Sequence, residues 1–204
     1  MTTTFITGAN KSLGLETARR LVEAGHTVLL GARHRERGRA AAESLGARFV
    51  QIDVTDDASV QAAAADVAAH EGTIDALVNS AGVLGKVGPV EEYTAADVSA
   101  VLDVNVVGIV RVTHAFLPLL RKSPNPVIVN VSSGMGSFSM TQAARRRGSA
   151  RRVPGGSVRV ACPSWHVPDP LRPRGHLREA VAVGPHAGCP WRDAAPSAPA
   201  RTAR

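Results

Sequence analysis

The chain is poor in aromatic residues and in cysteine, and it has no long hydrophobic run. Aromatic residues make up 3% of its 204 positions. Its two cysteines, Cys162 and Cys189, lie far apart and show neither metal-binding nor redox spacing. No run approaches the ~18 apolar residues of a membrane span, and the N-terminus lacks a basic stretch followed by an apolar signal core. These absences make a globular cytoplasmic protein without a metal site the default interpretation.

The positive net charge is confined to the C-terminal part of the chain. Residues 1–142 hold 12 Lys and Arg against 14 Asp and Glu, whereas residues 143–204 hold 12 Arg, no Lys and 3 acidic residues. Gly, Ala, Arg and Pro supply 39 of these last 62 residues, and Phe, Tyr, Met, Ile, Asn, Lys and Gln are missing from them. Such a composition does not support a packed core. It predicts a domain over 1–142 followed by a disordered tail over 143–204.

Two explanations for this tail stay open. The enriched residue types have GC-rich codons and several missing types have AT-rich codons, as out-of-frame translation of a GC-rich gene would produce. The alternative is a natural disordered arm. A basic tail can also indicate nucleic-acid binding, but this one lacks interleaved aromatic residues, which disfavours nucleic acid as a partner. Within the tail, only Ser157–Ala161 and His176–Val183 show any local pattern.

Residues 1–142 alternate between short apolar runs and helix-like segments. The predicted strands are Thr3–Thr7, Thr27–Leu30, Arg48–Ile52, Ile74–Asn79 and Val127–Val131. The predicted helices are Leu13–Ala24, Arg35–Leu45, Asp56–His70 and Ala95–Leu120. Thr94 and Asp97 form a loose capping box at the start of the last helix. This alternation predicts an α/β protein with a parallel sheet covered on both faces. No strand is predicted after Val131, so the fifth strand would keep an uncovered edge.

The segment Thr7-Gly8-Ala9-Asn10-Lys11-Ser12-Leu13-Gly14 joins the first strand to the first helix. Gly8 allows the tight turn, and Gly14 lets the helix pack close to the sheet. This arrangement lays a nucleotide pyrophosphate on a helix N-terminus. The usual dinucleotide fingerprint has a middle glycine, which Ser12 replaces here with a hydroxyl that can donate to phosphate. On its own, such a glycine turn is a weak signal.

Further motifs follow in a fixed order. Asp53-Val54 comes after the third strand, Asn79-Ser80-Ala81-Gly82 after the fourth, Asn105 lies within the long helix, and Val129–Gly136 closes the fifth strand. The whole set resembles the short-chain dehydrogenase/reductase family, above all its NADPH-dependent carbonyl reductase branch, over residues 1 to about 140. The resemblance implies a Rossmann-like, doubly wound parallel sheet of order 3-2-1-4-5, incomplete here on its C-terminal side.

The resemblance also implies roles for these residues. Ser133 would polarise the substrate carbonyl, and Asn105 would place a proton-relay water by opening the helix locally. Asp53 and Val54 would hold the adenine. The pyrophosphate turn would be formed by Thr7, Gly8, Lys11, Ser12, Leu13 and Gly14. The inner half of the cofactor would be lined by Asn79, Ala81 and Gly82.

Most of these residues have a structural alternative. In a purely structural role, Asp53 would cap the turn before Asp56 and Asn79 would hold neighbouring strands together. Asn105 would then be a core amide whose hydrogen bonds are satisfied. Ser132 and Ser133 would bond the loop backbone as ordinary strand-end serines.

The end of the second strand bears on the choice of cofactor. NAD enzymes of this architecture place an acid there to accept the ribose hydroxyls. This chain has Gly31-Ala32-Arg33-His34, with no acid. Arg33 can fork onto a 2′-phosphate, and Lys11 points to the same region. NADP(H) is therefore the predicted cofactor, and the alternative is that Arg33 is a solvated loop residue.

The proton donor of the resembled family is missing. Its members use a Tyr-x-x-x-Lys pair after the fifth strand. The one tyrosine here, Tyr93, precedes the long helix, Asp97 stands four positions later, and no lysine follows Lys122. We therefore expect an oxidoreductase by family, for a small carbonyl or alcohol substrate, that is inactive as it stands. A nucleotide-binding module without chemistry and a nucleic-acid-associated protein are the alternatives. The homo-oligomeric state stays open because the helices that usually build the subunit interface are missing.

Overall fold

The computed structural model describes residues 1–133 and 178–183. Within these residues, six strands form one parallel sheet in the order β3-β2-β1-β4-β5-β6. The strands are β1 (Thr3–Ile6), β2 (Thr27–Ala32), β3 (Arg48–Gln51), β4 (Ala76–Asn79), β5 (Val127–Ser132) and β6 (Arg178–Val183). The predicted α/β class and the order 3-2-1-4-5 of the first five strands are thus confirmed.

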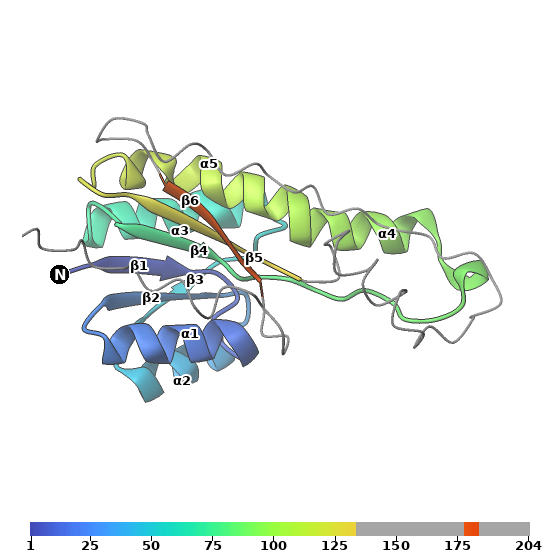
Figure 1. Cartoon of the computed structure of the whole chain (residues 1–204), viewed down its shortest axis with the longest axis horizontal. Coiled ribbons are helices and arrows are strands. Elements are labelled where there is room, and N and C mark those ends of the chain that lie inside the picture. Colours follow the sequence, from blue (N-terminus) through green and yellow to red (C-terminus); the bar gives the residue numbers. More distant parts are fainter. Residues whose placement is uncertain (134–177, 184–204) are drawn as a thin grey trace, which may run out of the picture.

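Helices cover both faces of this sheet. The α-helices are α1 (Ser12–Glu23), α2 (Arg35–Leu45), α3 (Asp57–His70), α4 (Ala95–Leu102) and α5 (Gly108–Leu120). A 3₁₀ turn, η1 (Val90–Glu92), precedes α4, and a π-helical turn, η2 (Asp103–Val107), joins α4 to α5. Figure 1 shows α1 and α2 on one face of the sheet and α3 and α5 on the other, with α4 extending beyond the carboxyl ends of the strands.

Each face of the sheet has its own hydrophobic core. On the α3–α5 face, Phe5 stacks on Phe116 with 4.4 Å between ring centroids. On the α1–α2 face, Ile6, Leu30 and Val78 pack with alanines of the two helices. Neighbouring residues such as Phe5 and Ile6 point to opposite faces, as side chains of a strand do. The strands are therefore apolar at successive positions, because both of their faces are buried.

The long predicted helix over Ala95–Leu120 is present but contains the π-turn. It begins with the predicted capping box: Thr94 Oγ1 accepts from the Asp97 N–H, and the Asp97 carboxylate accepts from the Thr94 N–H. By length and hydropathy alone, this helix could also cross a membrane. Core helices of globular proteins pass the same test, and α5 buries Val112 and Phe116 against the sheet.

The expectation that β5 would keep an uncovered edge is wrong. β6 pairs with β5 in parallel over six residues, from Val127 opposite Arg178 to Ser132 opposite Val183. β6 falls within His176–Val183, one of the two tail segments with a local pattern. An open strand edge presents unpaired N–H and C=O groups, and pairing with a further strand satisfies them. The remaining predicted tail lies outside the described residues, so its disorder stays a prediction.

Asp75 ties the amino ends of three strands together through its side chain and its backbone. Its carboxylate accepts from the Thr3 N–H at 2.8 Å and from the Ser123 hydroxyl at 2.6 Å. Its backbone carbonyl accepts from the Val127 N–H at 2.9 Å. One residue thus joins the starts of β1, β4 and β5. Their opposite, carboxyl ends are where the predicted site residues lie.

We expect Asp75→Ala to lower the free energy of unfolding by about 2–3 kcal/mol, because it leaves two half-buried donors without an acceptor. Chemical denaturation of the full chain measures this. The matched control is Glu43→Ala on the exposed side of α2, which should stay within about 0.5 kcal/mol of the unmodified chain. An equally small loss for both variants would show that the Asp75 carboxylate does not hold these strands together.

Candidate functional site

The predicted site residues gather at the carboxyl edge of the sheet. Parallel strands bring their carboxyl ends to one edge, so the loops after β1, β2, β3 and β4 meet there. Ser133 is exposed and directly follows β5 at the same edge. Asn105 reaches the segment after β4 from the π-turn. The structure therefore brings together segments that are up to about 120 residues apart in the sequence.

Thr7 fastens the loop after β1 to the loop after β4. Its side chain is 1% exposed, and its Oγ1 accepts from the N–H groups of Ser80 and Ala81 at 3.0 and 3.1 Å. Its own N–H donates to the Val78 carbonyl at 2.9 Å. Gly8 has a φ of +66°, and a Cβ there would lie 2.7 Å from the Ala81 Cα. No other residue type fits at position 8 unless the two loops move apart.

The N-terminus of α1 is open to an anion. Lys11 is the N-cap residue, its side chain makes no cap bond, and the first turn contains no acidic residue. Gly14 packs so closely that a Cβ would lie 2.6 Å from the Gly8 carbonyl oxygen. Unsatisfied N–H groups and the helix dipole favour a phosphate at such a position. The segment predicted to hold a pyrophosphate therefore has the required cradle, which includes the partly exposed Leu13.

Ser12, where the usual fingerprint has its middle glycine, has a φ of +51°. It is the one non-glycine residue with positive φ in the described part of the chain. Left-handed backbone costs an L-residue other than Gly, Asn or Asp roughly 1–2 kcal/mol. The glycine-like conformation is thus retained without the glycine.

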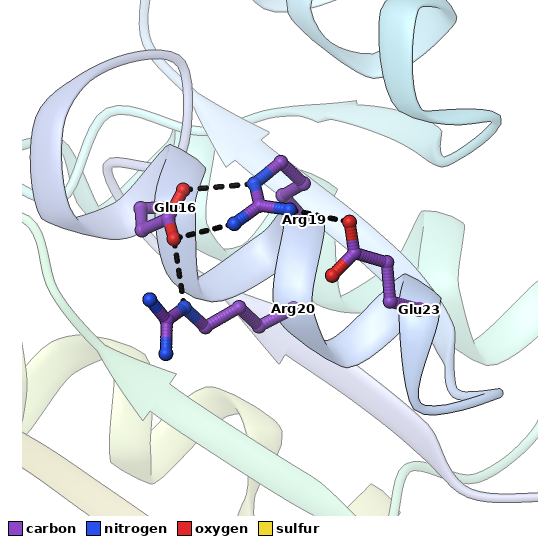
Figure 2. A network of polar contacts seen from close by, with 4 residues as sticks. All are labelled: Glu16, Arg19, Arg20 and Glu23. Carbon is purple, nitrogen blue, oxygen red and sulfur yellow. Dashed lines mark hydrogen bonds and ion pairs between the residues drawn. The ribbon is translucent and has the colours of Figure 1, made fainter.

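An acidic residue one turn further along α1 is neutralised by its neighbours. Glu16 binds Arg19 and Arg20, each through an N···O distance of 2.7 Å, and Arg19 also binds Glu23 (Figure 2). The hydrogen bond from Arg19, followed by that from Arg20, lowers the pKa of Glu16 to about 2. Glu16 stays ionised at neutral pH, but its charge is paired. It therefore opposes an anion at the helix N-terminus only weakly.

Arg33 and Asp53 contact each other across the ends of β2 and β3. Arg33 is exposed, and its Nε lies 3.9 Å from Asp53 Oδ2. Asp53 Oδ1 accepts from the N–H and the hydroxyl of Thr55 at 3.0 and 2.7 Å. Burial raises the pKa of Asp53, but the bonds from Thr55 and the charge of Arg33 outweigh it and hold the pKa below its usual value. Asp53 therefore does cap its own turn, while Oδ2 faces the cation predicted to bind a 2′-phosphate.

Asn79 bridges β4, β5 and α5. Its Nδ2 donates to Asn130 Oδ1 at 2.8 Å and to Thr113 Oγ1 at 3.3 Å. Asn79 Oδ1 is buried and has no hydrogen-bond partner among the described residues. The structural alternative for Asn79, holding strands together, is thus realised. Ala81, two residues after Asn79, packs against Gly8 through its backbone.

Asn105 lies in the π-turn, so the helix does open where the resemblance implied. Its Oδ1 accepts from the Val83 N–H at 2.9 Å, and its Nδ2 donates to the Val83 carbonyl at 2.8 Å. A Cβ at Gly82 would lie 3.4 Å from the same Oδ1. Both ends of the amide are thus used to fix the segment after β4. Each polar atom of the amide makes one bond to Val83, which leaves one N–H and one lone pair that these bonds do not use.

Two polar residues of α5 that support the site were not predicted from the sequence. Thr113 accepts from Asn79, and Arg111 bonds to Asp103 at 2.7 Å. A signal was present for Arg111, because it is a lone cation within the apolar run Val106–Phe116. A charge at such a place needs a partner.

A cleft of about 330 Å³ lies along β3, away from this site. Its lining comes from α2, β3 and α3 and includes Arg35, Arg39 and Arg48. Arg48 is already paired with Asp66 and Glu71 at 2.7 and 2.6 Å. None of the predicted site residues lines the cleft. We therefore assign it no part in the site.

The order of the strands and the helices on both faces are those of a Rossmann-like α/β protein. A model of the family described as short chain dehydrogenase matches residues 2–145. The chain belongs to this family, whose members are oxidoreductases that use a nicotinamide cofactor. The resemblance inferred from the sequence is confirmed.

Individual relatives agree. A short-chain dehydrogenase/reductase of Aspergillus fumigatus is 37% identical over 169 residues, covering 76% of this chain and 63% of that protein. An NADPH-dependent pterin aldehyde reductase of Arabidopsis thaliana is 34% identical over 163 residues, covering 78% and 67%. The solved structure of salutaridine reductase from Papaver somniferum superposes with a TM-score of 0.62 at 30% identity, covering 68% and 60%. The chain thus spans roughly three-fifths of the length of such proteins.

We expect Ser12→Gly to stabilise the chain by about 0.5–1 kcal/mol, because glycine adopts positive φ without strain. The change in the free energy of unfolding, from urea denaturation, measures it. Ser99→Gly is the control, at an exposed position inside α4 with ordinary helical backbone, and it should destabilise by about 0.5 kcal/mol. Destabilisation by both variants would mean that Ser12 carries no backbone strain.

Proposed function

We propose that this chain binds NADP(H) at the carboxyl edge of the sheet. The proposed family chemistry is hydride transfer between that cofactor and a small carbonyl or alcohol substrate. The observation that carries the proposal is Arg33 at the end of β2. It is exposed, no acid stands beside it in the sequence, and its Nε lies 3.9 Å from the Asp53 carboxylate. The loop before α1 adjoins this strand end, because the Ala9 N–H donates to the Gly31 carbonyl at 3.0 Å. A guanidinium suits a 2′-phosphate, whereas an NAD site needs a carboxylate at this point.

Each part of the cofactor is assigned to its own group of residues. The pyrophosphate lies on α1, held by the backbone of Lys11, Ser12, Leu13 and Gly14 and by the turn that Thr7 and Gly8 shape. Arg33 and Lys11 take the 2′-phosphate. Lys11 supports this role because its side chain makes no hydrogen bond or ion pair with the described residues. Asp53 and Val54 hold the adenine, while Asn79, Ala81 and Gly82 line the inner half.

At the reacting end, NADP(H) supplies the hydride. Ser133 polarises the substrate carbonyl by donating its hydroxyl proton in a hydrogen bond. We assign the water of the proton relay to the π-turn that carries Asn105. An i→i+5 turn leaves a backbone carbonyl without its usual helical donor, so the water would bind such a carbonyl, while the Asn105 side chain fixes the segment after β4.

The proton donor is missing from these 204 residues. Tyr93 donates its hydroxyl to the Lys86 carbonyl, outside the long helix and with Asp97 four positions later. A lysine beside the tyrosine is needed to lower its pKa. We therefore propose that the chain as it stands binds cofactor without turning over. The proposed compartment is the cytoplasm, which rests on the sequence alone.

The alternative of a nucleic-acid-associated protein rests on the basic tail, which lies outside the described residues. Cofactor fluorescence separates it from the proposal, because only a nucleotide-binding chain changes the emission of NADPH. The alternative of a binding module without chemistry agrees with the proposal on binding, and turnover separates it from an active enzyme.

NADPH should bind about tenfold or more tightly than NADH, because the phosphate adds charge-assisted hydrogen bonds. Arg33→Asp should narrow or invert this preference in a calorimetric titration. The control, Arg121→Asp, changes the same charge at the end of α5, next to the amino ends of the strands. It should leave the ratio unchanged. Equal affinity of the unmodified chain for both cofactors would rule out the NADP assignment.

Purified protein should oxidise no NADPH above blank with generic aldehydes, ketones or quinones. General acid catalysis contributes roughly 10²–10⁴-fold, and misplacement of the nicotinamide adds about 10²-fold. Absorbance at the NADPH band, followed with and without substrate, measures the rate. Robust turnover that disappears in Ser133→Ala would show that the tail folds and supplies an acid.

A further inference from the structure

Arg111 lies between two segments to which the proposed function gives different tasks. From α5, its Nη1 donates to Asp103 Oδ1 at 2.7 Å, at the start of the π-turn. The same nitrogen donates to the Val54 carbonyl at 3.3 Å, in the loop after β3. Its Nε pairs with Asp57 Oδ1 at 3.0 Å, where α3 begins. One guanidinium thus bonds both the adenine-side loop and the turn that carries Asn105.

The backbones of these two segments also lie unusually close. A Cβ at Gly108 would stand 3.0 Å from Val54 Cγ2 and 3.1 Å from the Val54 carbonyl oxygen. A Cβ there would need its neighbours to give way by a few tenths of an ångström, so the glycine favours the close approach of α5 to the loop. Val54 is 8% exposed and belongs to the core of that face. The loop and the start of α5 are therefore packed directly against each other.

We propose that Arg111 is a positioning residue that couples the adenine end of the site to the π-turn carrying Asn105. Ordering of the Asp53–Val54 loop by an adenine nucleotide passes through Arg111 to Asp103 and tightens the turn. This inference rests on the proposed function, because it takes the tasks of Val54 and Asn105 from there. It adds a residue that touches neither cofactor nor substrate.

The fork of arginine is what this position requires. The guanidinium is planar and presents several donors in fixed directions, so it can bond three oxygens on separate segments at once. A lysine ammonium keeps the charge but is a single point on a flexible stem. Arg111 is only 21% exposed, so its contacts are partly shielded from water.

The test is amide hydrogen exchange by NMR on the full chain, with adenosine 2′,5′-bisphosphate as the probe. This molecule carries the adenine and the 2′-phosphate but no nicotinamide. Two amides report on the turn: Gly108, which bonds to the Asp103 carbonyl, and Val83, which bonds to Asn105 Oδ1. Saturating probe should slow both by about fivefold or more, the lower end of common coupling factors.

Arg111→Met and Arg111→Lys should still bind the probe but reduce this protection to less than about twofold, since neither joins the three oxygens. Arg121→Met, which removes an exposed charge from the end of the same helix, should keep full protection. Retained protection in Arg111→Met, or protection lost equally in the Arg121 control, would overturn the proposal. So would an unmodified chain that binds the probe without slowing Gly108.

A nucleotide-free measurement separates this proposal from the function it rests on. If the unmodified chain binds no probe, the cofactor assignment fails. The role of Arg111 is then tested by amide exchange in the protein without nucleotide. Asp57→Ala removes the exposed partner of the Arg111 Nε. In the chain that keeps Arg111, this change should speed amide exchange at Gly108 about fivefold. The same change should add nothing further in Arg111→Lys. Equal effects in both backgrounds would show that Arg111 transmits nothing.

Discussion

The site depends on one contact, the close approach of the loops after β1 and β4. The Thr7 hydroxyl accepts two backbone N–H groups there, and Gly8 leaves no space between the loops for a Cβ. Each of the two donors would cost about 1–3 kcal/mol if left unsatisfied. The position of Gly8 in turn fixes that of α1, because Gly14 packs on its carbonyl. The geometry that suits a phosphate is therefore set by packing of the apo protein and does not wait for a ligand.

The other end of the site depends on the π-turn. An extra residue in a helical turn widens it and turns Asn105 toward the segment after β4, which the amide then holds by both of its polar atoms. Arg111 holds the same turn from the side of β3. The long helix is thus fixed at its middle by polar contacts and along α5 by apolar packing. Its α4 end has no buried residue and extends past the sheet.

Local signals in the sequence predicted most of the fold and part of the site. Apolar periodicity gave nine segments within a few residues of their observed ends, and the box of Thr94 and Asp97 marked where the long helix starts. The hydrogen-bond partners of Asn79 and Asn105 could not be predicted from the sequence. Asn130 reaches Asn79 only through the strand register, and Val83 reaches Asn105 only through the opening of the helix. β6 was missed since its six residues sit in a composition that argues against any packed element.

The structure also separates binding from chemistry along the chain. The phosphate cradle, the cation at the end of β2 and the adenine-side loop all come from the first three strands and their loops, and β4 completes the contact with Gly8. The contacts described for this edge lie within residues 1–133. Ser133 stands at the boundary, and the family's proton donor belongs to an element beyond it. Under the proposed function, a chain that departs from the family after this point would lack the proton donor and keep the residues assigned to the nucleotide.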